Sequence, residues 1–283
     1  MKLYTHLKTF LILGVSVFLT SCDAWLFPEP NFENDLLADH LELGNPSRAA
    51  NESDNYLLYK TQFALSYNNE KAIPNWVSWH LSNAWLGMTD RQDDFRSDSD
   101  LPNFLYKVSG SDYRGSGFDR GHLCPSADRT LTPADNSSTF VMTNMIPQSP
   151  DNNRGPWADL ENYCRHLIEG GNLELYILAG TYGLGGEGAS GSEESIDENR
   201  IAVPQQTWKI IVVLPQGTND LARVNPNTRV IAVDMPNRQG IRDQEWRDFR
   251  TTVDDLEEKT GLDFLSNVAP SVQRLIEARL DQG

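Results

Sequence analysis

Short runs of bulky apolar and aromatic residues recur along the chain, and they predict strands. Some alternate bulky with small residues, the pattern expected where successive side chains point to opposite faces of a sheet. The predicted strands are Tyr56–Tyr59, Phe63–Tyr67, Trp76–Leu81, Thr139–Met145, Leu173–Leu178, Thr207–Leu214 and Thr228–Val233.

Helical patterns are fewer. A helix is predicted over 155–169, because Pro156 is tolerated in a first helical turn and a glycine pair follows the last apolar residue. Two more helices are predicted at 243–260 and 271–280. Residues 183–198 are rich in glycine, serine and acidic residues, which predicts a mobile surface loop. The chain therefore has the pattern of a mixed α+β domain.

The N-terminus has the pattern of a targeting signal. Lys2 and Lys8 precede the apolar run Phe10–Leu19, which is shorter than the roughly 20 residues of a membrane-spanning helix. The run ends at Leu19-Thr20-Ser21-Cys22, which resembles a bacterial lipoprotein box. We expect a signal peptide over 1–21 and lipid on Cys22; a plain secretory signal is the alternative. The protein is then exported, and is either a lipoprotein anchored in the cell envelope or secreted.

Residues 22–52 have little regular pattern and are rich in Asn, Glu, Asp and Pro. They predict a tether, with one short helix near Asn34–Leu43, ahead of a folded domain over 53–283. If Cys22 carries lipid, Cys124 and Cys164 remain. In an exported protein these two could pair or could stay as free thiols.

The charge of the chain restricts its partners. The formal net charge is −16 at pH 7, whereas proteins that bind nucleic acid are usually basic because they neutralise phosphates. Composition alone therefore argues against a nucleic-acid partner. A locally basic cleft on an acidic body is still compatible with one.

The string Asp119-Arg120-Gly121-His122 is the strongest candidate for chemistry. Hydrolysis of a phosphodiester needs a base for water and a group that holds charge on phosphorus. The histidine side chain has a pKa suited to the first task, and the arginine fork matches phosphate oxygens. The intervening glycine allows backbone or substrate to approach closely.

A second group of polar residues follows around the predicted helix. Asn153 stands just before it, and Glu161 and Arg165 lie four residues apart on one helical face. On a structural interpretation, Asn153 is a helix N-cap and the other two form a surface ion pair. On a functional interpretation, the amide and the carboxylate suit magnesium, which takes oxygen ligands and keeps several waters.

These motifs occur together with Thr143-Asn144-Met145-Ile146-Pro147-Gln148 and with a tail containing Thr260-Gly261-Leu262-Asp263-Phe264-Leu265. In this order they resemble the DNA/RNA non-specific endonucleases with a ββα-metal active site, and are closest to the cyanobacterial sugar-non-specific nucleases. The resemblance runs from about Tyr56 to the C-terminus. It implies an α+β fold, in which a central antiparallel sheet has flanking helices and a ββα-metal motif.

The resemblance also implies roles. His122 would be the general base, Asn153 the direct ligand of one Mg²⁺ or Mn²⁺ ion, and Glu161 a ligand through water. Arg91 would meet the phosphate. Residues with less defined roles would be the nearby arginines Arg120 and Arg165, the supporting residues Asp119 and Asn144, and the substrate contacts Arg96 and Arg129.

The implied reaction cuts single- and double-stranded DNA and RNA to 5′-phosphate and 3′-hydroxyl ends. A small acidic inhibitor protein is an implied partner, the membrane is reached only through the lipid anchor, and a monomer is the default. The chain departs from the family at Cys124, where relatives carry a small residue. If the strand of His122 continues, Cys124 shares its side and could bond Cys164. The alternatives are a hydrolase of another phosphodiester and a non-catalytic nucleic-acid-binding or envelope lipoprotein.

Overall fold

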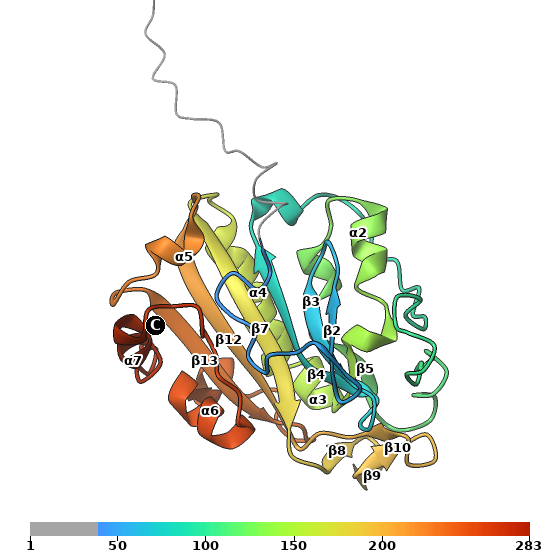
Figure 1. Cartoon of the computed structure of the whole chain (residues 1–283). Coiled ribbons are helices and arrows are strands. Elements are labelled where there is room, and N and C mark those ends of the chain that lie inside the picture. Colours follow the sequence, from blue (N-terminus) through green and yellow to red (C-terminus); the bar gives the residue numbers. More distant parts are fainter. Residues whose placement is uncertain (1–38) are drawn as a thin grey trace, which may run out of the picture. The chain divides into compact units, whose positions relative to one another are not determined.

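A computed structural model describes residues 39–283, and its centre is an antiparallel sheet of eight strands (Figure 1). The strand order is β1-β2-β3-β4-β7-β12-β13-β14. The bounds are β1 Asn51–Glu52, β2 Asn55–Tyr59, β3 Ala64–Asn68, β4 Ile73–Leu81, β7 Leu173–Tyr182, β12 Gln206–Pro215, β13 Arg229–Pro236 and β14 Arg250–Thr251. The predicted α+β class and the central antiparallel sheet are confirmed.

Strict alternation along the central strands divides the core between the two faces of the sheet. On β12, Ile211 belongs to one hydrophobic cluster, whereas Trp208 and Ile210 belong to the other. On β7, Ile177 and Tyr176 divide in the same way. A strand that is buried on both faces has an almost continuous apolar sequence. For this reason β7 and β12 could be predicted from the sequence.

Different segments cover the two faces. On one lie strands β5 (Asp119–His122) and β6 (Met145–Gln148) and helix α4 (Pro156–Ile168), which passes behind β7 and β12 in Figure 1. On the other lie α6 (Val253–Thr260) and α7 (Pro270–Ile276). The remaining elements are η1 Asn83–Trp85, η2 Ser126–Asp128, α2 Pro133–Ser138, η3 Met142–Asn144, α3 Pro150–Asn153, α5 Asp220–Arg223 and η4 Trp246–Phe249.

Within 53–283, three predicted elements differ in kind from the structure. Residues 139–145 are not one strand, because η3 occupies Met142–Asn144 and only Met145 begins β6. Of the helix predicted at 243–260 only α6 forms, since η4 and β14 precede it. The predicted loop at 183–198 contains three short strands, β8 Gly186–Gly188, β9 Gly191–Glu193 and β10 Ser195–Ile196, and β10 pairs with β11 Ile201–Ala202.

The start of the domain also lies earlier than predicted. His40, Leu43 and Ala49 are buried, and the backbone carbonyl of His40 accepts a hydrogen bond from Ser78 at 2.6 Å. These few apolar residues in a polar segment pack on the sheet, so the end of the proposed tether is part of the domain. Residues 40–43 form a turn rather than the end of a helix.

The predicted signal peptide and Cys22 lie outside the described residues. Within 39–283, no helix is both long and apolar enough to cross a membrane.

Candidate active site

The DRGH string forms one strand of a ββα unit. β5 pairs antiparallel with β6, so that Asp119 lies opposite Gln148 and His122 opposite Met145, and α3 and α4 follow. Gly121 is required here because a Cβ at this position would lie 2.1 Å from the Gln148 Oε1 atom. We expected backbone or substrate to approach this glycine closely, and in the structure it is the partner strand β6 that does so.

His122 lies in a pocket of aromatic rings with its Nε2 unused. The side chain makes edge contacts to Phe140 and Phe95, with ring centroids 4.9 and 5.6 Å away, and the residue is 8% exposed. Nε2 has no hydrogen-bond partner among the described residues. Burial lowers the pKa of His122 to about 3, and the positive charges of Arg91 and Arg120 add to the effect. The imidazole is therefore neutral at pH 7 and carries one unprotonated ring nitrogen.

Asn153 is oriented by Asp119. Its Nδ2 donates to the Asp119 Oδ2 atom at 2.8 Å, which turns the amide oxygen away from that carboxylate. Arg154 holds the same carboxylate with two hydrogen bonds of 2.8 and 2.5 Å. The residue that caps α4 is Gly155, which makes no side-chain cap bond. The N-cap interpretation of Asn153 is therefore wrong, and its amide oxygen is left for a ligand.

Glu161 is held by a buried lysine. Lys209 Nζ lies 3.2 Å from Glu161 Oε1, and the lysine side chain is 1% exposed. The same Nζ lies 4.0 Å from the ring centroid of Trp157, and the Nε1 of Trp157 donates to the backbone carbonyl of His122 at 3.3 Å. Burial raises the pKa of Glu161, and the positive charges of Lys209 and Arg165 oppose that shift. Glu161 is thus tied through two buried side chains to the strand of His122.

Arg165 does not form the surface ion pair with Glu161 that spacing suggested. It donates instead to Asp128 at 2.7 Å and to Asn162 at 2.6 Å. Asp128 is buried and also accepts a hydrogen bond from Trp79 Nε1 at 3.0 Å. Arg165 is therefore fixed by a buried carboxylate that sequence reasoning did not single out.

Two arginines line the approach to His122. Arg91 lies over the Phe140 ring, 4.7 Å from its centroid, and donates to Ser126 Oγ at 2.8 Å. Arg120 lies 3.9 Å over the centroid of Phe95. Both rings also contact His122, so the two cations and the imidazole share one aromatic wall. Arg91 also forms an ion pair with Asp93 at 2.7 Å, so the charge of the wall is partly neutralised, but two arginines beside the imidazole still fit the locally basic cleft that a phosphate substrate requires.

The two arginines given minor roles behave differently. Arg96 is 43% exposed in its side chain and pairs with Asp94 at 2.8 Å. Arg129 is fully buried, and it donates to the backbone carbonyls of Gln62, Asp128 and His80. A substrate contact for Arg129 is therefore wrong, because its guanidinium is used to hold the chain together.

Asn144 organises the turn that follows His122. Its Oδ1 accepts from the backbone nitrogen of Cys124 at 2.9 Å, and its Nδ2 donates to the carbonyls of Cys124 and Thr139 at 2.8 and 2.9 Å. Every hydrogen-bonding group of the amide is thus directed at backbone. The residue supports the end of β5 and cannot itself reach a substrate.

Cys124 and Cys164 are buried free thiols, so the proposed disulfide is not formed. The prediction assumed that strand alternation continued from His122 to Cys124, but β5 ends at His122. Burial raises the pKa of each thiol to about 12. Both sulfurs therefore serve as small apolar groups in the core beside the ββα unit.

The residues of this unit fit a divalent cation. The orientation of Asn153 leaves an amide oxygen, and the bond from Lys209 to one carboxylate oxygen of Glu161 leaves the other. Oxygen donors with room for several waters suit magnesium or manganese. Lys209 and Asp128 support this site, and neither of them was identified from the sequence. The sequence did contain a signal for Lys209, because it is a lone lysine inside the apolar run of β12.

Comparison with known proteins gives one consistent family. The family model of the DNA/RNA non-specific endonucleases matches residues 44–271. The chain is 51% identical to a nuclease of Nostoc sp. over 86% of both proteins. It is 30% identical to Nuclease C1 of Cunninghamella echinulata over 81% of this chain and 88% of that protein.

Similarity extends to animal proteins and to a solved structure. The mitochondrial nuclease EXOG of Mus musculus is 32% identical over 72% of this chain, which spans 55% of that protein. A chain of the solved EndoG/EndoGI complex superposes with a TM-score of 0.67 at 25% identity, covering 83% of this chain and 93% of that chain. The chain belongs to the DNA/RNA non-specific endonuclease family, and it is a phosphodiester-hydrolysing endonuclease.

Proposed function

We propose that this endonuclease cuts DNA and RNA, single- or double-stranded, with one Mg²⁺ or Mn²⁺ ion, and that His122 is its general base. The observation that carries this proposal is the neutral imidazole of His122, which shares one aromatic wall with the cations Arg91 and Arg120. Asn153 would hold the cation directly, and Glu161 would hold it through water. When bound, the cation would act as a Lewis acid on the phosphate and the leaving oxygen.

The protein groups have separate tasks in this reaction. His122 takes the proton of the attacking water on a ring nitrogen. Arg91 and Arg120 lie beside the imidazole and offset the charge that develops on the phosphate. Because water is the nucleophile, the ribose 2′-hydroxyl is not needed, so both polymers are cut to 5′-phosphate and 3′-hydroxyl ends.

The test is digestion of supercoiled plasmid and of RNA, with magnesium, with manganese and with chelator. We expect His122→Ala to lower the rate by about 10²–10⁴-fold, the usual contribution of a general base. The Asn153→Ala variant should need a far higher metal concentration for half-maximal activity. The control variants His166→Ala and Asn103→Ala alter exposed residues outside the ββα strands and should stay active. Full activity of His122→Ala would exclude its role as base.

We also propose export as a lipoprotein, on the sequence at Leu19–Cys22. Labelling with a radioactive fatty acid in a bacterial host should tag the wild-type protein and not Cys22→Ser. If both remain unlabelled while the protein is released, it is secreted without lipid.

A small acidic inhibitor protein is a further proposed partner. The EndoG/EndoGI structure concerns the inhibition of EndoG, and the arginine wall beside His122 here would suit an acidic protein. Binding should weaken with salt and with Arg120→Ala. Binding that withstands both would require another surface.

A further inference from the structure

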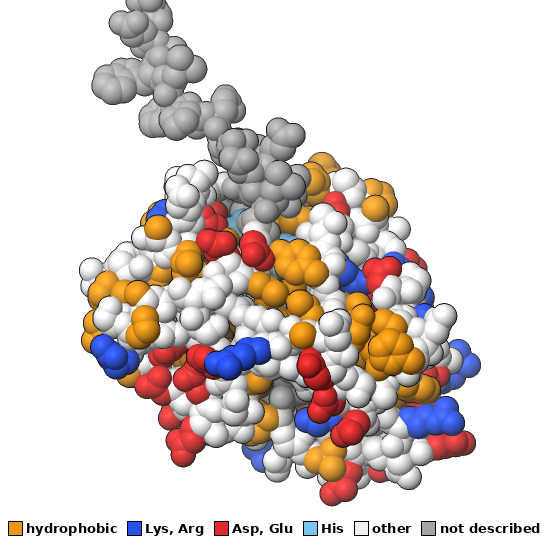
Figure 2. All heavy atoms as spheres, viewed as in Figure 1, with side chains coloured by type: hydrophobic (Ala, Val, Ile, Leu, Met, Phe, Trp, Pro, Cys, Tyr) orange, Lys and Arg blue, Asp and Glu red, His pale blue; other side chains and the backbone are white. Residues whose placement is uncertain are grey.

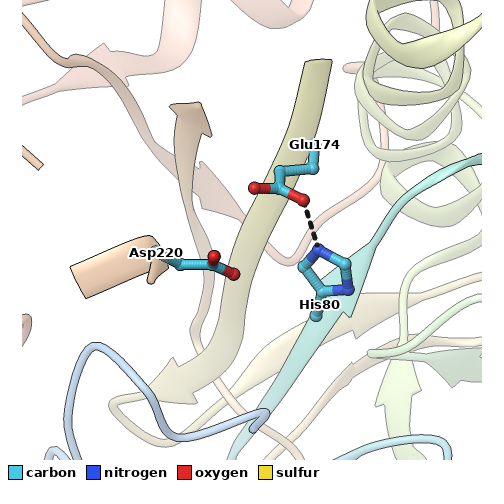
Figure 3. A group of neighbouring side chains, drawn as sticks. All are labelled: His80, Glu174 and Asp220. Carbon is cyan, nitrogen blue, oxygen red and sulfur yellow. Dashed lines mark hydrogen bonds and ion pairs between the residues drawn. The ribbon is translucent and has the colours of Figure 1, made fainter. Parts of the chain in front are cut away.

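Within residues 39–283, two groups of histidine, aspartate and glutamate side chains outside the active site are close enough to share a cation. Figure 3 shows the first, in which His80, Glu174 and Asp220 converge from β4, β7 and α5. Its charges are already matched within the chain. Arg223 forms ion pairs with Glu174 and with Asp220, and His80 Nε2 lies 3.3 Å from Glu174. This group therefore needs no metal.

The second group has no basic side chain in an ion pair with it in the part of the chain that the structure describes. It consists of Asp254 and Glu257 on α6 and Glu277 directly after α7, and one carboxylate oxygen from each lies within 4.8 Å of the others. The charged groups that act on Glu277 are all acidic, namely Glu257, Asp254 and Asp263. In Figure 2, acidic side chains gather over α6, with some basic side chains beside them.

The environment of the Glu277 side chain indicates a cation site. The residue is only 6% exposed, and its Oε1 is buried without a hydrogen-bond partner in residues 39–283. Its backbone carbonyl accepts from the nitrogens of Val253 and Asp254 at 3.0 and 3.3 Å, which fixes Glu277 at the start of α6. A buried carboxylate oxygen is rarely left unpaired. One carboxylate oxygen of Glu277 also lies within 4.8 Å of oxygens from two further carboxylates, and a metal bound between them would satisfy all three.

The ligand set indicates which cation. Glu257 uses Oε1 to accept from the backbone nitrogen of Phe264 at 2.7 Å, so Oε2 is left. All available donors are carboxylate oxygens, and the Asp254 side of the group is exposed to water. Calcium takes several carboxylates in a flexible shell completed by waters, whereas magnesium demands a near-ideal octahedron and zinc prefers nitrogen or sulfur.

We propose that Asp254, Glu257 and Glu277 form a calcium site that joins α6 to the segment after α7. The site lies on the α6 and α7 face of the sheet, opposite the ββα unit. Its role is to hold the C-terminal segment in place, and it is independent of the catalytic cation.

The experiment is a calcium titration of the full-length, chelator-treated protein, followed by calorimetry and by thermal unfolding. We expect a Kd of about 0.1–1 mM, as in extracellular calcium modules, and a rise in Tm of about 3–8 °C at 10 mM calcium. Glu277→Gln should weaken binding at least about tenfold and remove the Tm rise. Asn153→Ala should keep both, because it alters only the proposed catalytic ligand.

Glu258→Gln is the matched control, since Glu258 is exposed on the same helix and is not a member of the group. It makes the same charge change and should respond to calcium as the wild type does. If Glu277→Gln does not fold, Asp254→Asn serves in its place, because Asp254 is exposed. The proposal is overturned if calcium does not bind the wild-type protein. It is also overturned if Glu277→Gln and Glu258→Gln show the same Kd and the same Tm rise.

Discussion

Lys209 and Glu161 form an ion pair, with 3.2 Å between Nζ and Oε1, inside the layer that separates the ββα unit from the central sheet. The lysine side chain is almost completely buried and lies over the Trp157 ring. A buried charge is stable only when it is paired. The pair therefore fixes the direction of the carboxylate that we assign to the metal.

Lys209→Met should reduce catalysis without removing any group that touches substrate. Loss of the positive charge raises the pKa of Glu161 further, since Lys209 is the main charge opposing its burial. We expect the magnesium concentration for half-maximal activity to rise about 10–100-fold, as for other groups that orient a metal ligand. The pH at which activity appears on the acidic side should also rise, because Glu161 is ionised only at higher pH in this variant.

Lys259→Met is the matched control for that variant. It breaks an ion pair with Asp234 of 2.8 Å, but the Lys259 side chain is 44% exposed. Its magnesium requirement should equal that of the wild type. An unchanged requirement in Lys209→Met as well would separate Glu161 from metal binding.

His40 should lower the stability of the protein on mild acidification. Burial lowers its pKa from 6.5 to about 3, and the charge of Arg129 adds to this effect. Its Nδ1 accepts from the backbone nitrogen of His80 and its Nε2 donates to the Thr61 carbonyl, so the folded state holds the neutral form. The unfolded state binds a proton at this position below pH 6.5, so His40 by itself contributes a loss of about 1.4 kcal/mol of stability per pH unit between pH 6.5 and pH 3, and His122 contributes a similar loss.

Urea unfolding at several pH values tests this dependence. His40→Gln should be less stable at pH 7 but should show a shallower decline, by about 1.4 kcal/mol per pH unit. His166 has a 74% exposed side chain, so His166→Gln should keep the slope of the wild type. Equal slopes in all three proteins would contradict the assignment to His40.

Gly121→Ala should destabilise the ββα unit. The added methyl group would lie 2.1 Å from Gln148 Oε1 and 2.5 Å from its Cβ, and Gln148 is fully buried. Overpacking of this kind costs about 1–3 kcal/mol, and displacement of β5 should also lower activity. Gly170→Ala is the control, because its Cβ would make only an ordinary contact of 3.5 Å with Asn172. Chemical denaturation of the two variants, compared with wild type, gives the difference directly.

The cysteine thiols should be inert in the native protein. Both are buried with a pKa raised to about 12, so almost no thiolate is present at pH 8. A thiol reagent should modify Cys124 and Cys164 only after denaturant is added, and reducing agent should leave Tm unchanged. A drop in Tm on reduction would restore the disulfide hypothesis.

Local pattern was sufficient wherever the chain obeys a simple period. The central strands β7 and β12 and the helix α4 were predicted closely, because burial of a strand or of one helical face imposes regular apolar spacing. It failed over 139–145, where Asn144 bonds to backbone and a 3-10 turn replaces the strand. It also failed over 243–249, where short elements follow one another without a period.

The sequence by itself determined the family, the α+β class and the residues that could perform the chemistry, because the motif DRGH and the spacing from Asn153 to Glu161 are local. Tertiary structure alone decided how those residues are supported. Lys209 and Asp128 come from distant segments to hold Glu161 and Arg165, and Arg129 is buried rather than offered to substrate. The reason is that burial and charge pairing depend on which segments meet across the sheet, and no local pattern contains that information.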